Sequence, residues 1–466
     1  MSDSPLPLLP PPPGSWAPAR RVVRALRYPV DRFLAIEASS GVLLLLASAV
    51  ALGWANSPWA ASYLALWHLP LGVTVGSTAV VLPLHAWIND VAMAVFFFVA
   101  GLEIRRELHQ GELSEPRRAA LPFAAALGGM LVPALVYAAF NVGRPSSGGW
   151  GIPMATDIAF AVGVFALLGG RAPPALRVLL LSLAVIDDLG AIAVIALGYS
   201  GALDPAGLGW ALVGFAAIPA LQAAGIRSPW PYLPAAALAW WGTYTSGVHA
   251  AIAGVALGLL TPVRAWLDAD AVARAAAATA ADLTAAPDAG SGLLPRLHGL
   301  ERAVREGVSP AERLQHRLHG AVAYGVMPAF AFANAGVPLG AADVTGEGRW
   351  VFLGIFLGLL VGKPVGVLLA IAGASGLGIA TRPAGVRWPS LSVLGMAAGI
   401  GFTMALFVAQ LAFPPGVLLE TAKLAILAAS TVAGALALVA GFGVLSPRAV
   451  PGAARSLVEA ERATDR

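Results

Sequence analysis

The chain alternates long apolar runs with short polar segments that are rich in arginine. A helix needs roughly 20 mostly apolar residues to cross a bilayer, so a run near that length predicts a transmembrane helix. About twelve such spans follow, at residues 33–52, 85–103, 119–140, 152–168, 176–197, 208–224, 232–245, 248–260, 321–332, 350–372, 391–411 and 422–442. The pattern therefore predicts an all-α polytopic membrane protein.

Polar segments divide the chain into a membrane domain and two tails. Residues 1–32 are rich in proline and arginine and predict a disordered cytoplasmic tail. Residues 33–444 form the predicted membrane domain, and residues 445–466 form a second cytoplasmic tail. Within the domain, residues 264–315 are alanine-rich and charged, so we expect a long cytoplasmic loop with some helix.

One short segment has the period of a strand and not of a helix. Residues 71–82 alternate in polarity on either side of Gly76 and Ser77. Alternation interrupted by two turn-forming residues is typical of a β-hairpin. We therefore predict a small hairpin outside the bilayer.

The arginines indicate how the spans are oriented. With a cytoplasmic N-terminus and about twelve spans, most of the 29 Lys and Arg fall on the cytoplasmic side. Only Arg144 and Arg349 fall in external loops, while Lys363 lies inside a span and Lys423 near a boundary. Because cytoplasmic loops are enriched in Lys and Arg, this distribution predicts that both termini are cytoplasmic.

Composition excludes several classes of protein. Hydrophobic residues make up 58% of the chain and charged residues 12%, and the mean hydropathy is +0.77, which is far from a soluble domain. The net charge of +4 comes without a long basic run, so nucleic acid is not an expected partner. Cysteine is absent, which excludes disulfides and thiolate metal sites.

Two adjacent carboxylates, Asp187 and Asp188, lie in the apolar run 179–195. One aspartate at the centre of a span costs about 2.5 to 3.5 kcal/mol on insertion, so the pair indicates an ion or proton pathway. Adjacent helical residues point about 100° apart, so both cannot face one partner squarely. The alternative is a structural pair that is hydrogen-bonded inside the helix bundle.

Two segments predict helices that are interrupted within the membrane. Residues 151–157 contain Pro153 followed by Thr156 and Asp157, and residues 395–403 are rich in glycine. Broken helices in corresponding positions indicate a transporter binding site at the interface of inverted-topology repeats. The alternative for the later segment is that its glycines only allow close helix packing.

Lys363 lies within the apolar run 350–372. A lysine inside the bundle should pair with an anion, and Asp187, Asp188 and Asp157 are the candidates. The alternative is a lysine near a helix end whose ammonium reaches the interface.

Several motifs together resemble the NhaA family of sodium/proton antiporters. The resemblance covers residues 33–442 and is specific because many motifs occur in the same order. They are Trp87-Ile88-Asn89-Asp90, Gly101-Leu102-Glu103, Ala155-Thr156-Asp157-Ile158-Ala159-Phe160, Ile186-Asp187-Asp188-Leu189-Gly190-Ala191-Ile192, Ser246-Gly247-Val248-His249-Ala250, Phe330-Ala331-Phe332-Ala333-Asn334-Ala335-Gly336-Val337, Gly362-Lys363-Pro364 and Gly399-Ile400-Gly401-Phe402-Thr403-Met404.

The resemblance implies a multi-pass antiporter of the bacterial inner membrane. Such a protein exchanges internal Na+ or Li+ for external H+ by alternating access, is electrogenic and pH-regulated, and is neither an enzyme nor dependent on a cofactor. By similarity it has twelve helices in inverted repeats, with two interrupted helices crossing beside the ion site. The predicted hairpin resembles the family's dimer contact, so the resemblance also implies a homodimer.

Roles for individual residues follow from the same resemblance. Asp187 and Asp188 would bind the transported cation and the protons, and Thr156 would add an oxygen ligand. Asp157 and Lys363 would compensate the partial charges of the helix ends where the two interrupted helices meet, and Lys363 would also pair with Asp187.

Regulation by pH is implied at three further residues. The family places pH-sensing carboxylates where Glu103 and Glu107 lie, and His249 would tune the response. The alternatives are ordinary salt bridges with neighbouring arginines for the glutamates and a structural role for the histidine. The family pattern has a glutamate where this chain has Gln315, so one titratable group is missing here.

Two other functions are compatible with a membrane protein that carries buried aspartates. One is a transporter of similar fold for an organic anion, although carboxylates dominate the polar residues of the predicted site. The other is an intramembrane aspartyl protease that uses Asp157 and Asp187. The Gly-x-Gly-Asp signature of that class is absent at both aspartates, and Lys363 would have no role in it.

Overall fold

A computed structural model describes residues 39–75, 78–285, 293–383 and 385–445. The predicted tails, apart from residue 445, lie outside the described residues, as does the start of the first predicted span.

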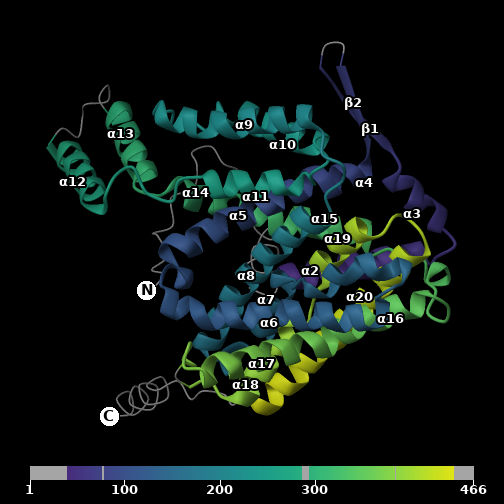
Figure 1. Ribbon diagram of the computed structural model, residues 1–466. Helices are drawn as coiled ribbons and strands as arrows, with labels where there is room; N and C mark the ends of the chain where they lie inside the picture. Colours follow the sequence, from purple (N-terminus) through teal and green to yellow (C-terminus); the bar gives the residue numbers. More distant parts are fainter. Residues whose placement is uncertain (1–38, 76–77, 286–292, 384, 446–466) are drawn as a thin grey trace, which may run out of the picture.

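Helices account for most of the described structure (Figure 1). The first half of the chain forms α2 (Ser39–Ala55), α3 (Ala60–Trp67), α4 (Leu84–Ala86), α5 (Met93–Gln110), α6 (Pro116–Asn141), α7 (Ile158–Leu167), α8 (Pro174–Gly198), α9 (Pro205–Ala223) and α10 (Tyr232–Thr245). The second half forms α11 (Ala251–Leu260), α12 (Ala269–Ala285), α13 (Leu293–Glu306), α14 (Pro310–Ala321), α15 (Met327–Asn334), α16 (Gly348–Leu357), α17 (Lys363–Gly376), α18 (Trp388–Ala398), α19 (Phe402–Ala412) and α20 (Val417–Val444).

Short segments of other helical types join several of these elements. The π-helical segments are η1 (Trp87–Ala92), η5 (Val322–Val326) and η7 (Gly358–Gly362). The 3-10 segments are η2 (Glu112–Ser114), η3 (Pro145–Met154), η4 (Gly169–Arg171) and η6 (Leu339–Ala341). Runs of 3-10 helix longer than three or four residues are uncommon, so the 10 residues of η3 are unusual.

Six continuous helical segments of the described chain are long and apolar enough to cross a membrane. They are Leu84–Gln110, Pro116–Asn141, Pro174–Gly198, Pro205–Ala223, Gly348–Gly376 and Val417–Val444. Three bent helix pairs raise the number to as many as nine, and the chain is therefore a multi-pass membrane protein. The count of twelve stays a prediction.

The described chain breaks at both places where the sequence predicts interrupted helices. η3 and α7 meet at a bend of 43°, and α18 and α19 meet at a bend of 46°. A third pair, α2 and α3, bends by 118°. The first span predicted from the sequence ends at residue 52, and no helix is predicted at α3, so this third bend was not predicted.

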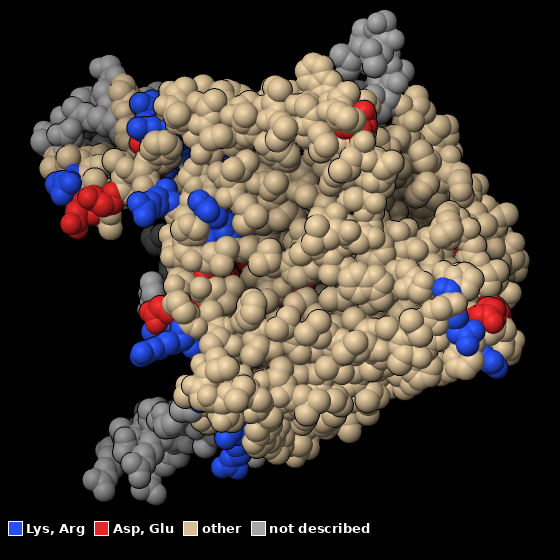
Figure 2. All heavy atoms as spheres, viewed as in Figure 1, with Lys and Arg blue, Asp and Glu red and all other residues tan. Residues whose placement is uncertain are grey.

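Charged side chains lie mainly at two ends of the molecule, and a broad uncharged belt separates them (Figure 2). Long helices such as α6 and α9 in Figure 1 run along the direction that joins these two ends. An uncharged belt crossed by helices is the arrangement that a bilayer requires.

α8 is the most enclosed of the six spans. In its most apolar window 61% of the residues are buried, against 22% to 44% in the other five. Asp187 and Asp188 lie on this helix, so the protein places its adjacent carboxylates in the interior of the bundle.

Two antiparallel strands lie where the sequence predicts a hairpin. β1 (Pro70–Val75) pairs with β2 (Thr78–Pro83), from Pro70 opposite Pro83 to Val75 opposite Thr78. Residues 76–77, where the turn is predicted, lie outside the described residues.

The predicted loop at residues 264–315 contains α12, α13 and the first part of α14. Glu306 at the end of α13 forms an ion pair of 2.6 Å with Arg227, which follows α9. This ion pair connects the helical part of the loop to the membrane domain.

Glycines allow α5 and α11 to pack closely. A Cβ added at Gly254 would lie 2.1 Å from the carbonyl oxygen of Ala94, so only glycine fits this crossing. We expect Gly254→Ala to lower the free energy of unfolding by about 1 to 3 kcal/mol, because the two helices must separate. Thermal unfolding in detergent measures the loss.

Gly209→Ala is the matched control, since no atom lies within 4 Å of a Cβ added at that position of α9. Equal melting temperatures for the two variants would contradict the close crossing.

Candidate functional site

The two breaks lie in contact with each other through their backbones. The Asp157 amide donates a hydrogen bond of 2.7 Å to the carbonyl of Ile400. The hydroxyl of Thr156 lies 3.0 Å from the carbonyl oxygen of Ala398. Because no water is available inside a bilayer, backbone groups freed by a break need such partners.

Asp157 lies at the start of both helices that follow the breaks. It caps α7, where its Oδ1 accepts a hydrogen bond of 3.0 Å from the Phe160 amide. Its Oδ2 accepts a bond of 3.1 Å from the Thr403 amide in the first turn of α19, and a second bond from the Thr403 hydroxyl. One fully buried carboxylate therefore compensates two positive helix ends.

Phe402 opens α19 in an unusual backbone conformation. Its φ of +21° is rare for an L-residue. Its amide donates a hydrogen bond of 3.0 Å to Ser430 Oγ on α20, and the next amide, of Thr403, donates to Asp157. The interior therefore holds the second break from two sides.

Lys363 carries a fully buried ammonium at the start of α17. Its Nζ lies 2.8 Å from Asp187 Oδ2 and donates to the carbonyl of Met154, the last residue of η3. The ammonium therefore faces a carboxylate and the carbonyl end of a broken helix, which carries partial negative charge.

Asp187 uses only one of its two oxygens in these contacts. Oδ2 accepts from Lys363 and from the Thr156 hydroxyl at 2.6 Å. Oδ1 is buried and has no hydrogen-bond partner among the described residues. An unpaired oxygen of a buried carboxylate is costly, and a cation or a proton would satisfy it.

Asp188 follows on α8 and is 5% exposed. Asp187, Glu103 and Asp157 lie near enough to repel its charge, and Lys363 attracts it. Within the described part of the chain, these carboxylates therefore outnumber the ammonium beside them, an imbalance that a bound cation or protons would relieve.

Comparison with known proteins assigns the family. A family model described as Na+/H+ antiporter 1 matches residues 31–440. The chain belongs to the Na+/H+ antiporter 1 family. The resemblance expected from the sequence motifs is confirmed, and the family is one of transporters and not of enzymes.

Full-length relatives carry names that agree with the family. The chain is 51% identical over 459 residues to Na(+)/H(+) antiporter NhaA 2 of Sorangium cellulosum, covering 97% of this chain and 98% of that protein. It is 53% identical over 456 residues to Na(+)/H(+) antiporter NhaA 2 of Myxococcus xanthus, covering 97% of both. A solved structure of the sodium proton antiporter MjNhaP1 from Methanocaldococcus jannaschii shares 12% identity at a TM-score of 0.46, over 88% of this chain and 92% of that chain, and adds nothing to the assignment.

The structure of this antiporter brings together five residues singled out in the sequence. They come from three separate parts of the chain and are Thr156, Asp157, Asp187, Asp188 and Lys363. Glu103 on α5 lies within electrostatic range of Asp188. Glu107, one turn further along α5, pairs with Arg106 at 3.5 Å and accepts from the Glu112 amide at 3.2 Å.

His249 has a different set of contacts. Its Nδ1 accepts a hydrogen bond of 3.2 Å from the Ala251 amide, so the proton of a neutral ring is on Nε2. Nε2 lies 3.6 Å from Asp90 Oδ1, and the edge of the ring packs against Phe407. The imidazole is therefore paired with a carboxylate that is not one of the α8 aspartates.

Three groups that contact the residues described above have no role predicted from the sequence: the Thr403 side chain, the Asp90 carboxylate and the Met154 carbonyl. Thr403 and Asp90 lie within the quoted motifs, and their polarity in apolar runs was the available signal. The Met154 carbonyl is a main-chain group and leaves no signal in the sequence.

The Thr403 hydroxyl supports the crossing of the two breaks. We expect Thr403→Val to lower the free energy of unfolding by about 1 to 3 kcal/mol, because Asp157 Oδ2 loses one of its two donors while buried. Thermal unfolding in detergent measures this change.

Thr431→Val is the control, because its hydroxyl donates to a carbonyl of its own helix at an exposed position. A loss of stability no larger than in this control would show that Asp157 does not depend on Thr403.

Proposed function

We propose that the chain exchanges internal Na+ or Li+ for external H+ at Asp187 and Asp188, by alternating access. Na+/H+ exchange itself follows from membership of the family. The observation that carries the site assignment is the unpaired Asp187 Oδ1, buried where the two broken helices meet.

The ligands are oxygens, as a hard cation such as Na+ requires. Asp187 Oδ1 and the Asp188 carboxylate supply charge, and the Thr156 hydroxyl supplies a neutral oxygen. That hydroxyl has one proton and two acceptors within 3.0 Å, Asp187 Oδ2 and the Ala398 carbonyl. When it donates to Ala398, its lone pairs are free for the cation.

Exchange follows from competition for the same oxygens. A cation that binds Asp187 weakens its pairing with Lys363, and protonation of Asp187 and Asp188 displaces the cation. The empty and fully charged site leaves carboxylates unbalanced in the membrane interior, so it reorients only when loaded.

Asp157 and Lys363 keep the broken helices together during this cycle. Asp157 balances the amino ends of α7 and α19, and Lys363 balances the carbonyl end of η3. Neither residue is a cation ligand in this proposal.

The membrane arrangement extends beyond the spans counted above. We assign the chain twelve spans in inverted-topology repeats, with both termini cytoplasmic in a bacterial inner membrane. The strands β1 and β2 lie on the external side and form the contact of a homodimer. The arginine distribution and the family support this arrangement.

Glu103, Glu107 and His249 regulate the exchange by pH. Support for Glu103 is its electrostatic contact with Asp188, through which its protonation changes the field at the site. His249 and Asp90 form a second titratable pair, which faces α19 through Phe407.

The aspartates of α8 are the central test. In inverted membrane vesicles with an imposed pH gradient, followed with a pH-sensitive dye across about pH 6.5 to 9, Na+ should dissipate the gradient for the parent chain. Asp187→Asn and Asp188→Asn should abolish this response, because an amide cannot bind both a cation and a proton in turn.

Asp204→Asn is the matched control, because the same change at the exposed cap of α9 keeps the capping function. Full activity in both α8 variants would overturn the site assignment. A parent chain that responds to no cation at any pH would favour an organic anion as substrate, and a peptidase assay tests the protease alternative.

Two carboxylates serving one cation predict that more than one proton moves per Na+. In proteoliposomes loaded with Na+, an inside-negative potential set by K+ and valinomycin should accelerate Na+ efflux, because net positive charge enters with the protons. Efflux that is insensitive to the potential would show electroneutral exchange. Liposomes that carry Asp188→Asn give the background rate.

A further inference from the structure

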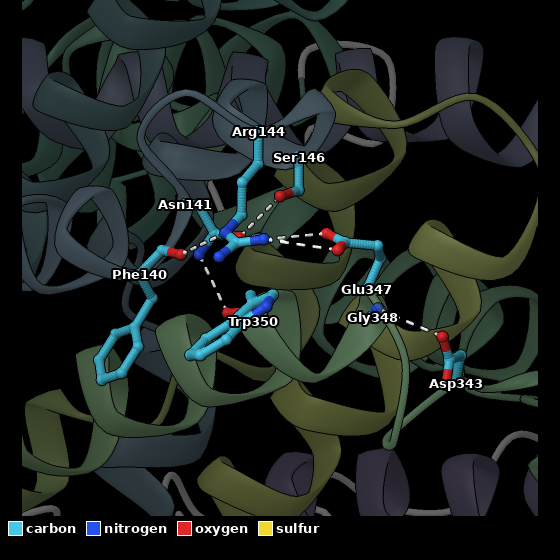
Figure 3. Close-up of polar contacts among 8 residues, drawn as sticks. All are labelled: Phe140, Asn141, Arg144, Ser146, Asp343, Glu347, Gly348 and Trp350. Carbon is cyan, nitrogen blue, oxygen red and sulfur yellow. Dashed lines mark hydrogen bonds and ion pairs between the residues drawn. The ribbon is translucent and has the colours of Figure 1, made fainter.

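Asn141 is the last residue of α6, shortly before η3 begins at Pro145, and its side chain is fully buried. Figure 3 shows the amide between two neighbouring elements, with Ser146 on one side and the Trp350 backbone on the other. A buried amide is costly unless its donors and acceptor are all bonded.

The Asn141 amide uses all of its hydrogen-bonding groups in a way that fixes its orientation. Nδ2 donates to the carbonyl of Tyr137 at 3.1 Å and to the carbonyl of Trp350 at 3.0 Å. Oδ1 accepts from the Ser146 hydroxyl at 2.7 Å. Two carbonyls around the nitrogen and a hydroxyl at the oxygen exclude the flipped amide.

The two elements bridged by Asn141 both lead to the ion site. Ser146 belongs to η3, which ends at Met154. Trp350 belongs to α16, and Lys363 begins α17. These two helices, with η7 between them, form one span of 29 residues, Gly348–Gly376. At their inner ends these elements meet again, because Lys363 donates to the Met154 carbonyl.

The two paths between these contacts are of similar length. Eight residues of 3-10 helix rise about 16 Å from Ser146 to Met154 at roughly 2.0 Å each. Thirteen residues rise about 20 Å from Trp350 to Lys363 at roughly 1.5 Å each. Asn141 therefore connects η3 and α16 at one end, and the bond from Lys363 to the Met154 carbonyl connects them at the other. A displacement of η3 along α16 at Asn141 would change the position of Met154 relative to Lys363.

Neighbouring contacts support the connection between η3 and α16 at Asn141. The Tyr137 hydroxyl donates to the Ser146 carbonyl at 2.7 Å. A Cβ added at Gly354 would lie 2.7 Å from Asn141 Nδ2, so α16 packs directly on the amide. A 3-10 segment as long as η3 depends on such external contacts to keep its shape.

An ion pair at the surface near Asn141 contributes less to this connection. Arg144 and Glu347 lie 3.1 Å apart, with side chains 33% and 71% exposed, and the guanidinium lies 4.6 Å from the centre of the Trp350 ring (Figure 3). Exposed pairs of this kind contribute little to stability. The buried amide and not the ion pair sets the position of η3 against α16.

We propose that Asn141 is a positioning residue of the ion site, which holds the Met154 carbonyl and Thr156 at the correct distance from Lys363 and Asp187. The inference rests on the proposed assignment of the cation site to Asp187 and Asp188. Loss of the Asn141 bridge lets η3 shift along α16, which moves the Thr156 oxygen relative to the carboxylates.

The test compares Na+ concentration dependence in variants that purify as monodisperse protein. Loss of residues that orient metal ligands typically lowers affinity by about 10- to 100-fold, so Asn141→Leu should raise the apparent KM for Na+ by about 10-fold while the maximal rate stays within about twofold. Ser146→Ala removes the hydrogen bond between η3 and Asn141 Oδ1 but keeps both bonds from Asn141 Nδ2, so it should give a smaller rise in KM.

Two control variants distinguish positioning from general stability. Asn56 has matching bonds, from Nδ2 to the carbonyls of Leu52 and Val337 and from the Leu339 amide to Oδ1, at an exposed position away from the site. Asn56→Leu and Arg144→Gln should leave the KM for Na+ unchanged.

The outcomes separate this inference from the proposed function. A parent KM in Asn141→Leu overturns the positioning role, even if Asp188→Asn is inactive and the site assignment stands. If Asn141→Leu does not fold, Ser146→Ala decides, and a KM equal to that of the parent overturns the role. Active Asp187→Asn and Asp188→Asn variants would remove the site on which the inference rests.

Discussion

A buried ammonium beside a buried carboxylate is the interaction on which the rest of this structure depends. Lys363 and Asp187 lie 2.8 Å apart, and both side chains are almost completely buried. Desolvation of an ion pair can cost more than its attraction returns, so such a pair persists only with further hydrogen bonds around it. Thr156 and the Met154 carbonyl supply these bonds. The break between η3 and α7 places both groups beside the pair.

The carboxylates around Lys363 differ in how well their charges are satisfied. Asp157 is satisfied by amides and a hydroxyl at two helix starts, whereas Asp188 faces like charges and one Asp187 oxygen has no partner among the described residues. In the proposed exchange cycle, the transported cation or the protons supply the missing charge.

Much of this centre could be predicted from the sequence, for a physical reason. Charged residues in apolar runs are costly, so Asp187, Asp188 and Lys363 stand out against their neighbours, and proline and glycine mark both broken helices. The residue pattern left three carboxylates as candidates for Lys363, and the family resemblance favoured Asp187, which is its partner in the structure. Thr156 and Ala398 are 242 residues apart in the chain. Asn141 lies among polar residues at a helix end, where nothing local distinguishes it.

The hydrogen bond from the Asp157 amide to the Ile400 carbonyl has a consequence for how such proteins diversify. Both of its atoms belong to the main chain, so every substitution at either position except proline at 157 leaves the bond possible. This main-chain bond therefore survives most changes of side chain at residues 157 and 400, unlike the bonds that depend on the Asp157 carboxylate and the Thr403 hydroxyl. Evolution can vary those side chains while one link between the two half-helices is kept.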